Sequence, residues 1–237
     1  MRRRVLFVLL AGLAGLVTAA CAPTPTSTPP TSAPTGTAGP TAGTGAPEPP
    51  PPATEPADPP GVEYRVSYNW AVPGTEASIA HPLTAPLPGP IGLPYLVGVY
   101  VGDHPEANPK YQRISFYFRL AFPSYRFQYV PQVLSDGSGE PVALPGNAFL
   151  NIVFVDAQAH DDNGASTIAA KPPATIGFAN LKGYALAGDF EGYVTYGLGI
   201  QVAPGSDQAL PIRAGELKKP DGSGGFFYVV HFDVQNG

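Results

Sequence analysis

Residues 188–202 read G-D-F-E-G-Y-V-T-Y-G-L-G-I-Q-V, and this stretch decides the fold class. Over its last nine positions, apolar residues alternate with small or polar residues. The apolar set is Val194, Tyr196, Leu198, Ile200 and Val202. Alternation with a period of two residues is typical of a strand that buries one face. The stretch therefore predicts a core β-strand.

The five residues before that strand predict a tight turn, because a glycine stands at each end of Asp189, Phe190 and Glu191. We expect these three side chains to be displayed at one end of the domain. One interpretation is an ordinary hairpin in which Phe190 folds back on the core. The other is a binding edge, where Phe190 and Tyr193 stack on a ligand while the two carboxylates accept hydrogen bonds from hydroxyls or amides.

Similar alternation recurs throughout residues 61–237. It predicts strands at 62–70, 97–101, 114–119, 125–130, 148–156, 181–187, 192–202, 211–214 and 226–234. Within the second of these, Val97, Val99 and Val101 are expected to share one face. Residues 71–94 and 160–173 are predicted as irregular connections, and no eleven-residue stretch has helical periodicity. Many short strands predict an all-β fold, a β-sandwich of short, mainly antiparallel strands.

The N-terminus has the organisation of a targeting segment. Three arginines are followed by an apolar run and then by small residues that end at Cys21. Residues 19–21 resemble the lipobox of a bacterial lipoprotein. A plain secretory peptide and an uncleaved helix are the alternatives, although the apolar run is shorter than the ~20 residues that a membrane span needs. We expect residues 1–20 to be removed and Cys21 to carry lipid, which would hold the protein on the outer face of the cell membrane.

Residues 21–60 differ in composition from the rest of the chain. After Cys21 they contain 14 of the 31 prolines and nine threonines, with no aromatic or large aliphatic residue. Such a segment cannot bury enough apolar surface to offset the entropy of ordering, so it is predicted to be a disordered linker. The proline run at 49–52 favours polyproline II geometry. The predicted organisation is a signal peptide (1–20), a linker (21–60) and a sandwich domain (61–237).

The charge and cysteine content exclude several functions. The chain has 13 basic and 18 acidic residues, and removal of the three N-terminal arginines would leave a net charge of −8. A protein this acidic does not hold nucleic acid or an anionic polymer by bulk electrostatics. The single cysteine excludes an internal disulfide and a cysteine-rich metal cluster. No cofactor is expected.

Several motifs together resemble the AMIN-like domain of actinobacterial envelope lipoproteins. They are V-Y-V-G-D-H at 99–104, Y-Q-R-I-S-F-Y-F at 111–118, the stretch 125–130 with G-S-G-E-P-V at 137–142, the segment 188–199, and the closing strand at 229–234. The resemblance spans roughly 140 residues, and abundant Ala, Gly and Pro suit an actinobacterial source. It implies a non-catalytic β-sandwich with a role in the cell envelope. Together with the lipobox and the linker, it favours a module that binds peptidoglycan or a wall-associated partner. A protein-interaction adaptor that does not contact glycan is the alternative.

One polar loop offers a different chemistry. Asp156, His160, Asp161 and Asp162 are close in sequence and could supply oxygen and nitrogen ligands for a metal-assisted hydrolase. The loop lacks the alternating ligands and the terminal glutamate of a calcium-binding EF-hand. No motif for a serine nucleophile or a phosphate-binding loop is present. A polar surface loop is the favoured interpretation, and an enzymatic role the less favoured one.

Overall fold

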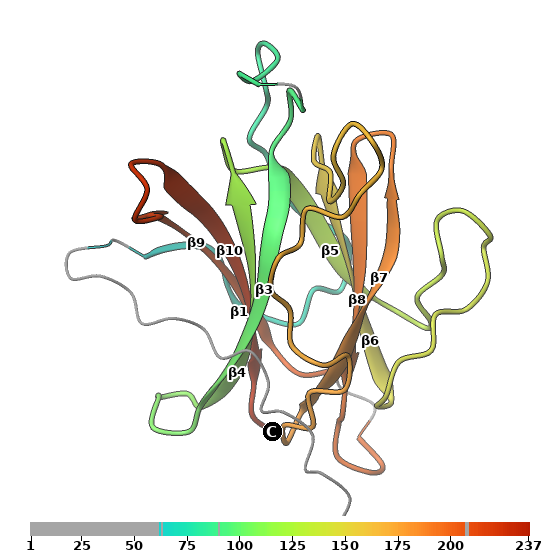
Figure 1. Cartoon of the computed structure of the whole chain (residues 1–237). Coiled ribbons are helices and arrows are strands. Elements are labelled where there is room, and N and C mark those ends of the chain that lie inside the picture. The colour runs from blue at the N-terminus through green and yellow to red at the C-terminus, as the bar shows by residue number, and fades with distance from the viewer. Residues whose placement is uncertain (1–61, 63, 90, 207–208) are drawn as a thin grey trace, which may run out of the picture. The chain divides into compact units, whose positions relative to one another are not determined.

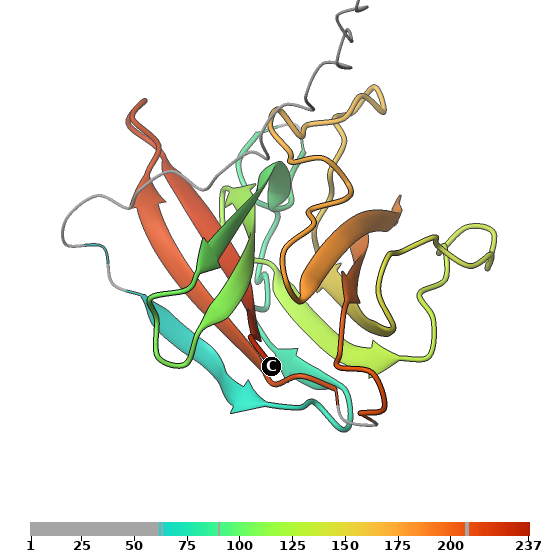
Figure 2. The same ribbon diagram turned by 90° about the horizontal axis from the view of Figure 1, so that it is seen from below.

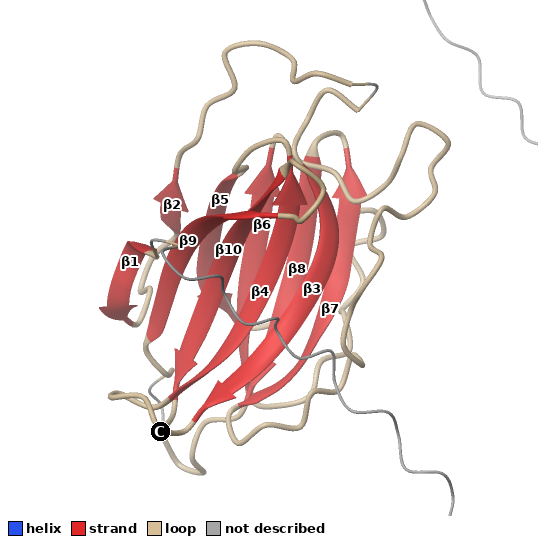
Figure 3. Ribbon diagram, turned by 60° about the vertical axis from the view of Figure 1, so that its left-hand side comes forward, coloured by secondary structure: helices blue, strands red, loops and turns tan. Residues whose placement is uncertain are grey.

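The computed structural model describes residues 62, 64–89, 91–206 and 209–237. The predicted signal peptide, Cys21 and the linker up to residue 60 lie outside these residues. In the described part the regular elements are all strands, and no helix has the length and apolar character of a membrane span (Figure 3). Two antiparallel sheets of five strands each pack face to face, which confirms the predicted all-β sandwich (Figures 1 and 2).

The first sheet lies on the left of Figure 1. In spatial order it contains β1 (Arg65–Ala71), β9 (Ile212–Pro220), β10 (Phe226–Gln235), β4 (Tyr111–Arg119) and β3 (Tyr95–His104). The second sheet contains β2 (Ala77–Ile79), β5 (Ser124–Val130), β6 (Ala148–Val155), β8 (Tyr193–Ile200) and β7 (Leu181–Phe190). Each sheet combines strands from both halves of the described chain, so neither sheet can form without the other half.

The core lies between the two sheets and is rich in aromatic rings. The apolar set of β8 and Val202 beyond it are at most 6% exposed, as predicted. The opposite face of β8 is buried as well, because residues 131–147 pack on it. Phe116 of β4 contacts Phe154 of β6 and Tyr196 of β8, with ring centroids 5.0 and 4.9 Å apart. Tilted and edge-on ring contacts of this kind add to the stabilisation from apolar burial. Among the described residues, both sheets contribute to this core.

The predicted face of β3 was wrong at its first position. Val99 and Val101 point into the core, but Val97 lies on the outer face and Leu96 takes the inner place. The cause is a register shift between Leu96 and Gly98, where β3 has one extra residue relative to β4. A bulge reverses the alternation on one side of it. Sequence alternation alone therefore could not place Val97.

The prediction that Gly188 forms one end of the turn was also wrong. Gly188 lies inside β7, where it pairs with Thr195, and the side chain of Asp136 packs directly on its Cα. Asp136 belongs to the loop 131–147, which crosses the outer face of β7 and β8. The same loop packs Pro145 on Gly199, where a Cβ would overlap the Pro145 carbonyl oxygen. Glycine is needed on these strands for close approach of the loop.

The outer face of the first sheet buries a network of charged residues. The carboxylate of Asp233 accepts hydrogen bonds from Arg113 Nε at 2.6 Å and from Arg213 Nη2 at 2.7 Å. The side chains of these three residues are 0%, 10% and 19% exposed. Rings from Tyr64 and Trp70 cover the guanidinium groups at 5.2 and 4.6 Å. We call these five residues the arginine cluster.

The outermost strands β3 and β7 are partly covered by loops. In β3, Leu96 N–H donates to Gln158 O and Val99 N–H donates to Ala170 O, at 2.9 and 2.8 Å. In β7, the N–H of Tyr184 donates to Ala174 O at 3.0 Å. The Ala187 carbonyl of β7 accepts a bond of 3.0 Å from the N–H of Asp136. Part of the hydrogen-bonding capacity of both edges is thus used within the domain.

Candidate functional site

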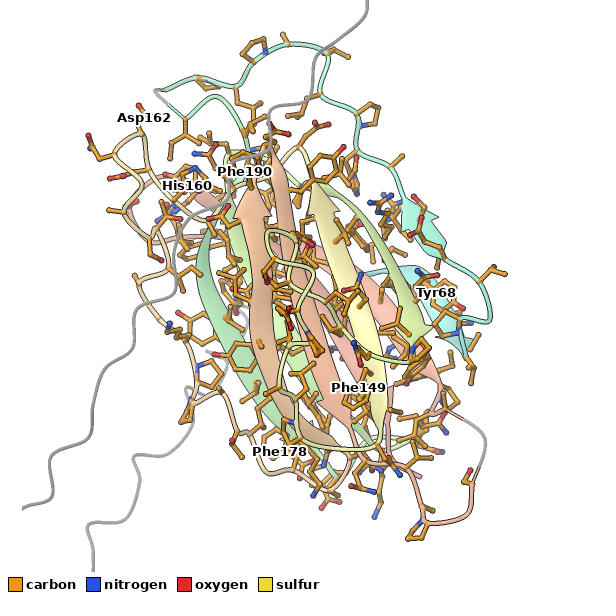
Figure 4. The ribbon with its side chains drawn as sticks, turned by 90° about the vertical axis from the view of Figure 1, so that its right-hand side faces the viewer. Tyr68, Phe149, His160, Asp162, Phe178 and Phe190 are labelled. Carbon is orange, nitrogen blue, oxygen red and sulfur yellow. The ribbon has the colours of Figure 1, made fainter. Side chains whose placement is uncertain are left out.

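The hairpin between β7 and β8 turns at Glu191 and Gly192. Both residues have positive φ angles, 51° and 80°, as a two-residue type I′ turn requires. The turn makes Phe190 and Tyr193 a directly opposed cross-strand pair. Phe190 is 69% exposed and Tyr193 is 44% exposed, so neither ring folds back on the core. The predicted display of Phe190 and Glu191 is confirmed, and Figure 4 shows Phe190 at one end of the sandwich.

Asp189 is placed differently from the prediction. It pairs with Val194, which is fully buried, so the alternation of β7 directs its carboxylate to the inner side rather than beside Phe190. Its Oδ1 accepts a hydrogen bond of 3.0 Å from the N–H of Ala159, and its Oδ2 lies 2.8 Å from Nδ1 of His160. The side chain of Asp189 is only 15% exposed. Asp189 therefore holds the loop that follows β6 and is not displayed at the edge.

A groove on the outer face of the second sheet begins at this hairpin and encloses about 380 Å³. We call it the hairpin groove, and its lining residues are Arg126, Asp136, Asn151, Val153, Phe190, Glu191, Tyr193 and Thr195. The register explains why they converge: Val153 pairs with Arg126 on one side and with Thr195 on the other. The loop that carries Asp136 forms one wall. Strands distant in sequence thus bring Arg126 and Asn151 beside the predicted edge.

The hairpin groove combines aromatic surface with both kinds of hydrogen-bonding group. Arg126 is a cation on one side, and its Nε lies 3.7 Å from the carboxylate of Glu76, with both side chains 43% exposed. Glu191 and Asp136 supply carboxylate acceptors, and Asn151 supplies an amide that both donates and accepts. Exposed rings beside a few polar groups are typical of sites that bind sugars or peptides. Sequence reasoning missed Arg126, Asn151 and Asp136, because only the strand pairing brings them to the hairpin.

The side chains of the polar loop at 156–162, weighed above as candidate metal ligands, have other partners. His160 is held by Asp189, while the Asp161 carboxylate accepts hydrogen bonds of 2.9 Å from the N–H groups of Asn163 and Ala165. These bonds, the one from Ala165 foremost, lower the pKa of Asp161. Among the described residues, no group of three or more His, Cys, Asp or Glu side chains could hold a metal ion. Figure 4 shows His160 and Asp162 at the same end as Phe190.

Comparison with models of known protein families shows to which family the chain belongs. The model of the AMIN-like domain matches residues 94–223, more than half of the sequence. The chain belongs to the AMIN-like domain family. The searches of curated proteins and of solved structures found no match. The resemblance seen in the sequence motifs is thereby confirmed at the level of the domain.

The AMIN-like match contains the whole hairpin groove. It starts one residue before β3 and ends in the turn between β9 and β10, so it includes every groove residue from Arg126 to Thr195. β1, β2 and β10 lie outside the matched residues, although β10 is a central strand of the first sheet. The groove is therefore built from the AMIN-like part of the chain, and Glu76 near its rim is not.

We expect Asp189→Ala to loosen the loop that follows β6 in this AMIN-like domain. The substitution removes the acceptor of both the Ala159 N–H and the His160 ring, and charge-assisted bonds of this kind contribute about 1.5–3 kcal/mol. The melting temperature should fall by several degrees, and the Ala159 amide should exchange faster with solvent. Asp162→Ala, an exposed carboxylate at the same end, is the control and should change neither measurement. Equal behaviour of the two variants would contradict the holding role of Asp189.

Proposed function

We propose that this protein is a non-catalytic binding module of the cell envelope, whose AMIN-like sandwich attaches to peptidoglycan through the hairpin groove. In this proposal, Phe190 and Tyr193 stack on the apolar faces of sugar rings. Asn151 and Glu191 bond the hydroxyl and amide groups of the glycan, and Arg126 binds a carboxylate of its peptides. Membership of the AMIN-like family supports an envelope role for the domain.

One observation carries the proposal: two exposed rings lie next to polar groups of both kinds in one open groove. Exposed aromatic side chains leave apolar surface in contact with water, which is unfavourable. Clusters of such side chains on a protein surface therefore often mark binding sites. Phe190 and Tyr193 are opposed across the hairpin, so their rings are held by the strands rather than by a long loop. A rigid aromatic pair binds with little loss of conformational entropy.

The charge of the protein fits a ligand that is not a polyanion. With a net charge of −8 after signal removal, the mature protein would be repelled by anionic wall polymers. Attraction must then come from stacking and hydrogen bonds, which the hairpin groove supplies. We therefore expect binding to purified peptidoglycan to persist at 0.5 M salt, since such contacts are screened less than surface ion pairs.

The proposal predicts a loss of wall binding when the groove loses its rings. A chain of residues 22–237 should sediment with purified peptidoglycan sacculi, and the double variant Phe190→Ser with Tyr193→Ser should bind at least ~10-fold more weakly, equivalent to ~1.4 kcal/mol. Both positions are exposed, so the melting temperature should stay close to that of the parent chain. Glu191→Gln should give a smaller loss, because it retains one acceptor oxygen.

Phe226→Ser is the matched control, since Phe226 is 43% exposed and lies outside the hairpin groove. It should bind sacculi like the parent chain. Equal binding by the groove variant and the parent would exclude the groove as the site. Failure of the parent chain to bind sacculi, together with capture of an envelope protein, would replace glycan recognition by the adaptor function.

The proposed location has its own test at Cys21. If this residue carries lipid, the mature protein partitions with membranes, and Cys21→Ala leaves an unprocessed precursor or releases the protein into the medium. Cell fractionation and the mass of the mature N-terminus measure the outcome. Normal size and normal membrane partitioning of the variant would contradict the lipid anchor on the outer face of the cell membrane.

A further inference from the structure

The outer face of the first sheet carries a second groove, remote in sequence from the hairpin. It encloses about 350 Å³ and is mainly aromatic and aliphatic. We call it the aromatic groove, and its principal lining residues are Tyr95, Val97, Tyr100, Tyr117, Arg119 and Phe227. They come from β3, β4 and β10, which are adjacent strands of one sheet. The groove therefore has a continuous sheet as its floor.

The rings of this groove form a ladder across the three strands. Tyr100 and Tyr117 have centroids 4.6 Å apart, and Tyr117 and Phe227 have centroids 5.4 Å apart. The guanidinium of Arg119 lies 4.4 Å from the centroid of Phe227. The ring of Tyr100 packs down on Gly98, where a Cβ would come within 2.8 Å of it. Glycine at position 98 therefore allows the Tyr100 ring to lie flat against the sheet, which leaves space in the groove above it.

The first described residues of the chain lie on the same outer face. Val62 and Tyr64 pack against the hydrophobic cluster of Tyr117, Leu217 and Val229, to which Val97, Tyr100 and Phe227 also belong. Tyr64 packs on Gly215 and His231, which pair across β9 and β10. The next pair on the same face of these strands is Leu217 and Val229. Val62 thus packs on the same cluster as Tyr117, which lines the aromatic groove.

We propose that the aromatic groove receives the proline-rich segment 49–60 of the same chain. This segment reads P-P-P-P-A-T-E-P-A-D-P-P and contains seven prolines and no basic residue. Aromatic-lined grooves bind proline-rich chains, because proline rings pack on flat aromatic faces and polyproline II loses little entropy on binding. The segment ends two residues before Val62, which packs on the same cluster as the groove residue Tyr117, so docking within one chain occurs at a high effective concentration.

Charge agrees with this occupant. Glu55 and Asp58 are the charged residues of the segment, and both are acidic. Arg119 lines the groove, with its side chain 29% exposed beside its partner Asp221. Lys219 lies on the same outer face, with its Nζ 4.8 Å from the centroid of Tyr117. Arg119 therefore offers the acidic segment a partly exposed cation, whereas Lys219 is buried at 4% exposure.

Docking would set how far the domain stands from its attachment point. Twelve residues of extended polyproline II span roughly 37 Å at ~3.1 Å per residue. When the segment occupies the aromatic groove, that length is folded back on the domain. The inference does not depend on what binds the hairpin groove, since the two grooves lie on the outer faces of different sheets.

Paramagnetic NMR tests the proposal on residues 22–237, which retain the segment and the whole core and have no cysteine. Thr54→Cys then supplies one site for a nitroxide label. We expect the amides of Gly98, Tyr117 and Phe227 to lose more than half of their intensity relative to the reduced label. The amides of Asn151 and Thr195, on the outer face of the other sheet, should keep theirs. Equal broadening on both faces, or none, would overturn the proposal.

Two variants and one mixing experiment make the test specific. Replacing prolines 49–52 by glycine in the labelled chain keeps the length and charge, and it should restore the intensities at the groove. Tyr100→Ser, with unchanged melting temperature, should do the same; if neither variant restores them, the segment does not dock there. Mixing labelled chains with isotope-enriched unlabelled chains should cause no broadening. Broadening in the mixture would assign the groove to a second copy and overturn docking within one chain.

Discussion

Asp233→Ala should be among the most destabilising single substitutions in the domain. It leaves the guanidinium groups of Arg113 and Arg213 buried on the outer face of the first sheet without the carboxylate that both contact. Removing one partner of a buried ion pair costs about 3–5 kcal/mol, because an uncompensated charge remains in a poorly solvated place. For a domain of this size, that corresponds to a fall in melting temperature of roughly 10 °C.

Glu76→Ala provides the comparison for that experiment. Glu76 also pairs with an arginine, but its carboxylate is 3.7 Å from Arg126 and both side chains are 43% exposed. Exposed pairs of this kind contribute at most about 1 kcal/mol. Thermal unfolding measures both variants, and the fluorescence of Trp70, which covers Arg213, reports directly on the arginine cluster. Similar melting temperatures for the two variants would show that the buried network adds nothing beyond a surface pair.

Stability should also fall as the pH is lowered from 7 to 5. Burial lowers the pKa of His231 well below its ordinary value of 6.5, and the nearby Arg113 and Lys219 act in the same direction. Below pH 6.5 the unfolded chain binds a proton at this histidine that the folded chain does not bind. The free energy of unfolding therefore falls as the pH drops below 6.5, with a slope of up to about 1.4 kcal/mol per pH unit.

Melting temperatures at several pH values, for the parent chain and for His231→Asn, test this expectation. The asparagine can still bond to Ser115, which lies 2.7 Å from Nδ1 of His231, but it does not titrate. The variant should lose most of the slope between pH 6.5 and 5. Burial also lowers the pKa of His104, so a smaller slope of the same sign should remain. Equal slopes in both proteins would mean that His231 is not protonated differently on unfolding.

The sequence predicted most of the strands because their alternation records burial directly. β4, β5, β6 and β8 lie where the patterns of apolar residues place them. β9 was predicted as a short strand at 211–214 but continues to Pro220. Its later residues include Glu216 and Lys219, which are buried at 2% and 4% exposure. Charged residues are ordinarily assigned to the surface, so a strand that buries them through partners escapes prediction.

The partners that allow Glu216 to be buried in β9 are distant in sequence. The local alternation of apolar and polar residues therefore could not reveal them. Glu216 accepts a hydrogen bond of 2.8 Å from the Tyr125 hydroxyl of the other sheet and lies 2.9 Å from Nε2 of His81. His81 was predicted to lie in an irregular connection, and the three-residue strand β2 within that connection was missed. A strand of three residues is too short to establish a period.

The sequence predicted the hairpin of the candidate site, but not the residues that other strands contribute to it. Glycine and turn chemistry in one short stretch indicated that Phe190 and Glu191 would be exposed at a hairpin. Whether Asp189 is exposed depends on which residues occupy the two turn positions, since moving the turn by one residue sends every side chain of β7 to the opposite face. The contribution of Arg126 and Asn151 depends on the order of strands in the sheet, which one sequence does not specify.

The loops that bond to β3 and β7 limit how this domain can meet a partner. Many sandwich domains capture an extended peptide by adding it as a further strand, which requires a long row of unoccupied backbone groups at a sheet edge. In β3 and β7 part of that row is already bonded to the chain's own loops. β1 has two register irregularities, and β2 has only three residues. In the proposed binding function, recognition would thus depend mainly on side chains of the outer faces. Single substitutions there can change specificity without changing the backbone of the sandwich.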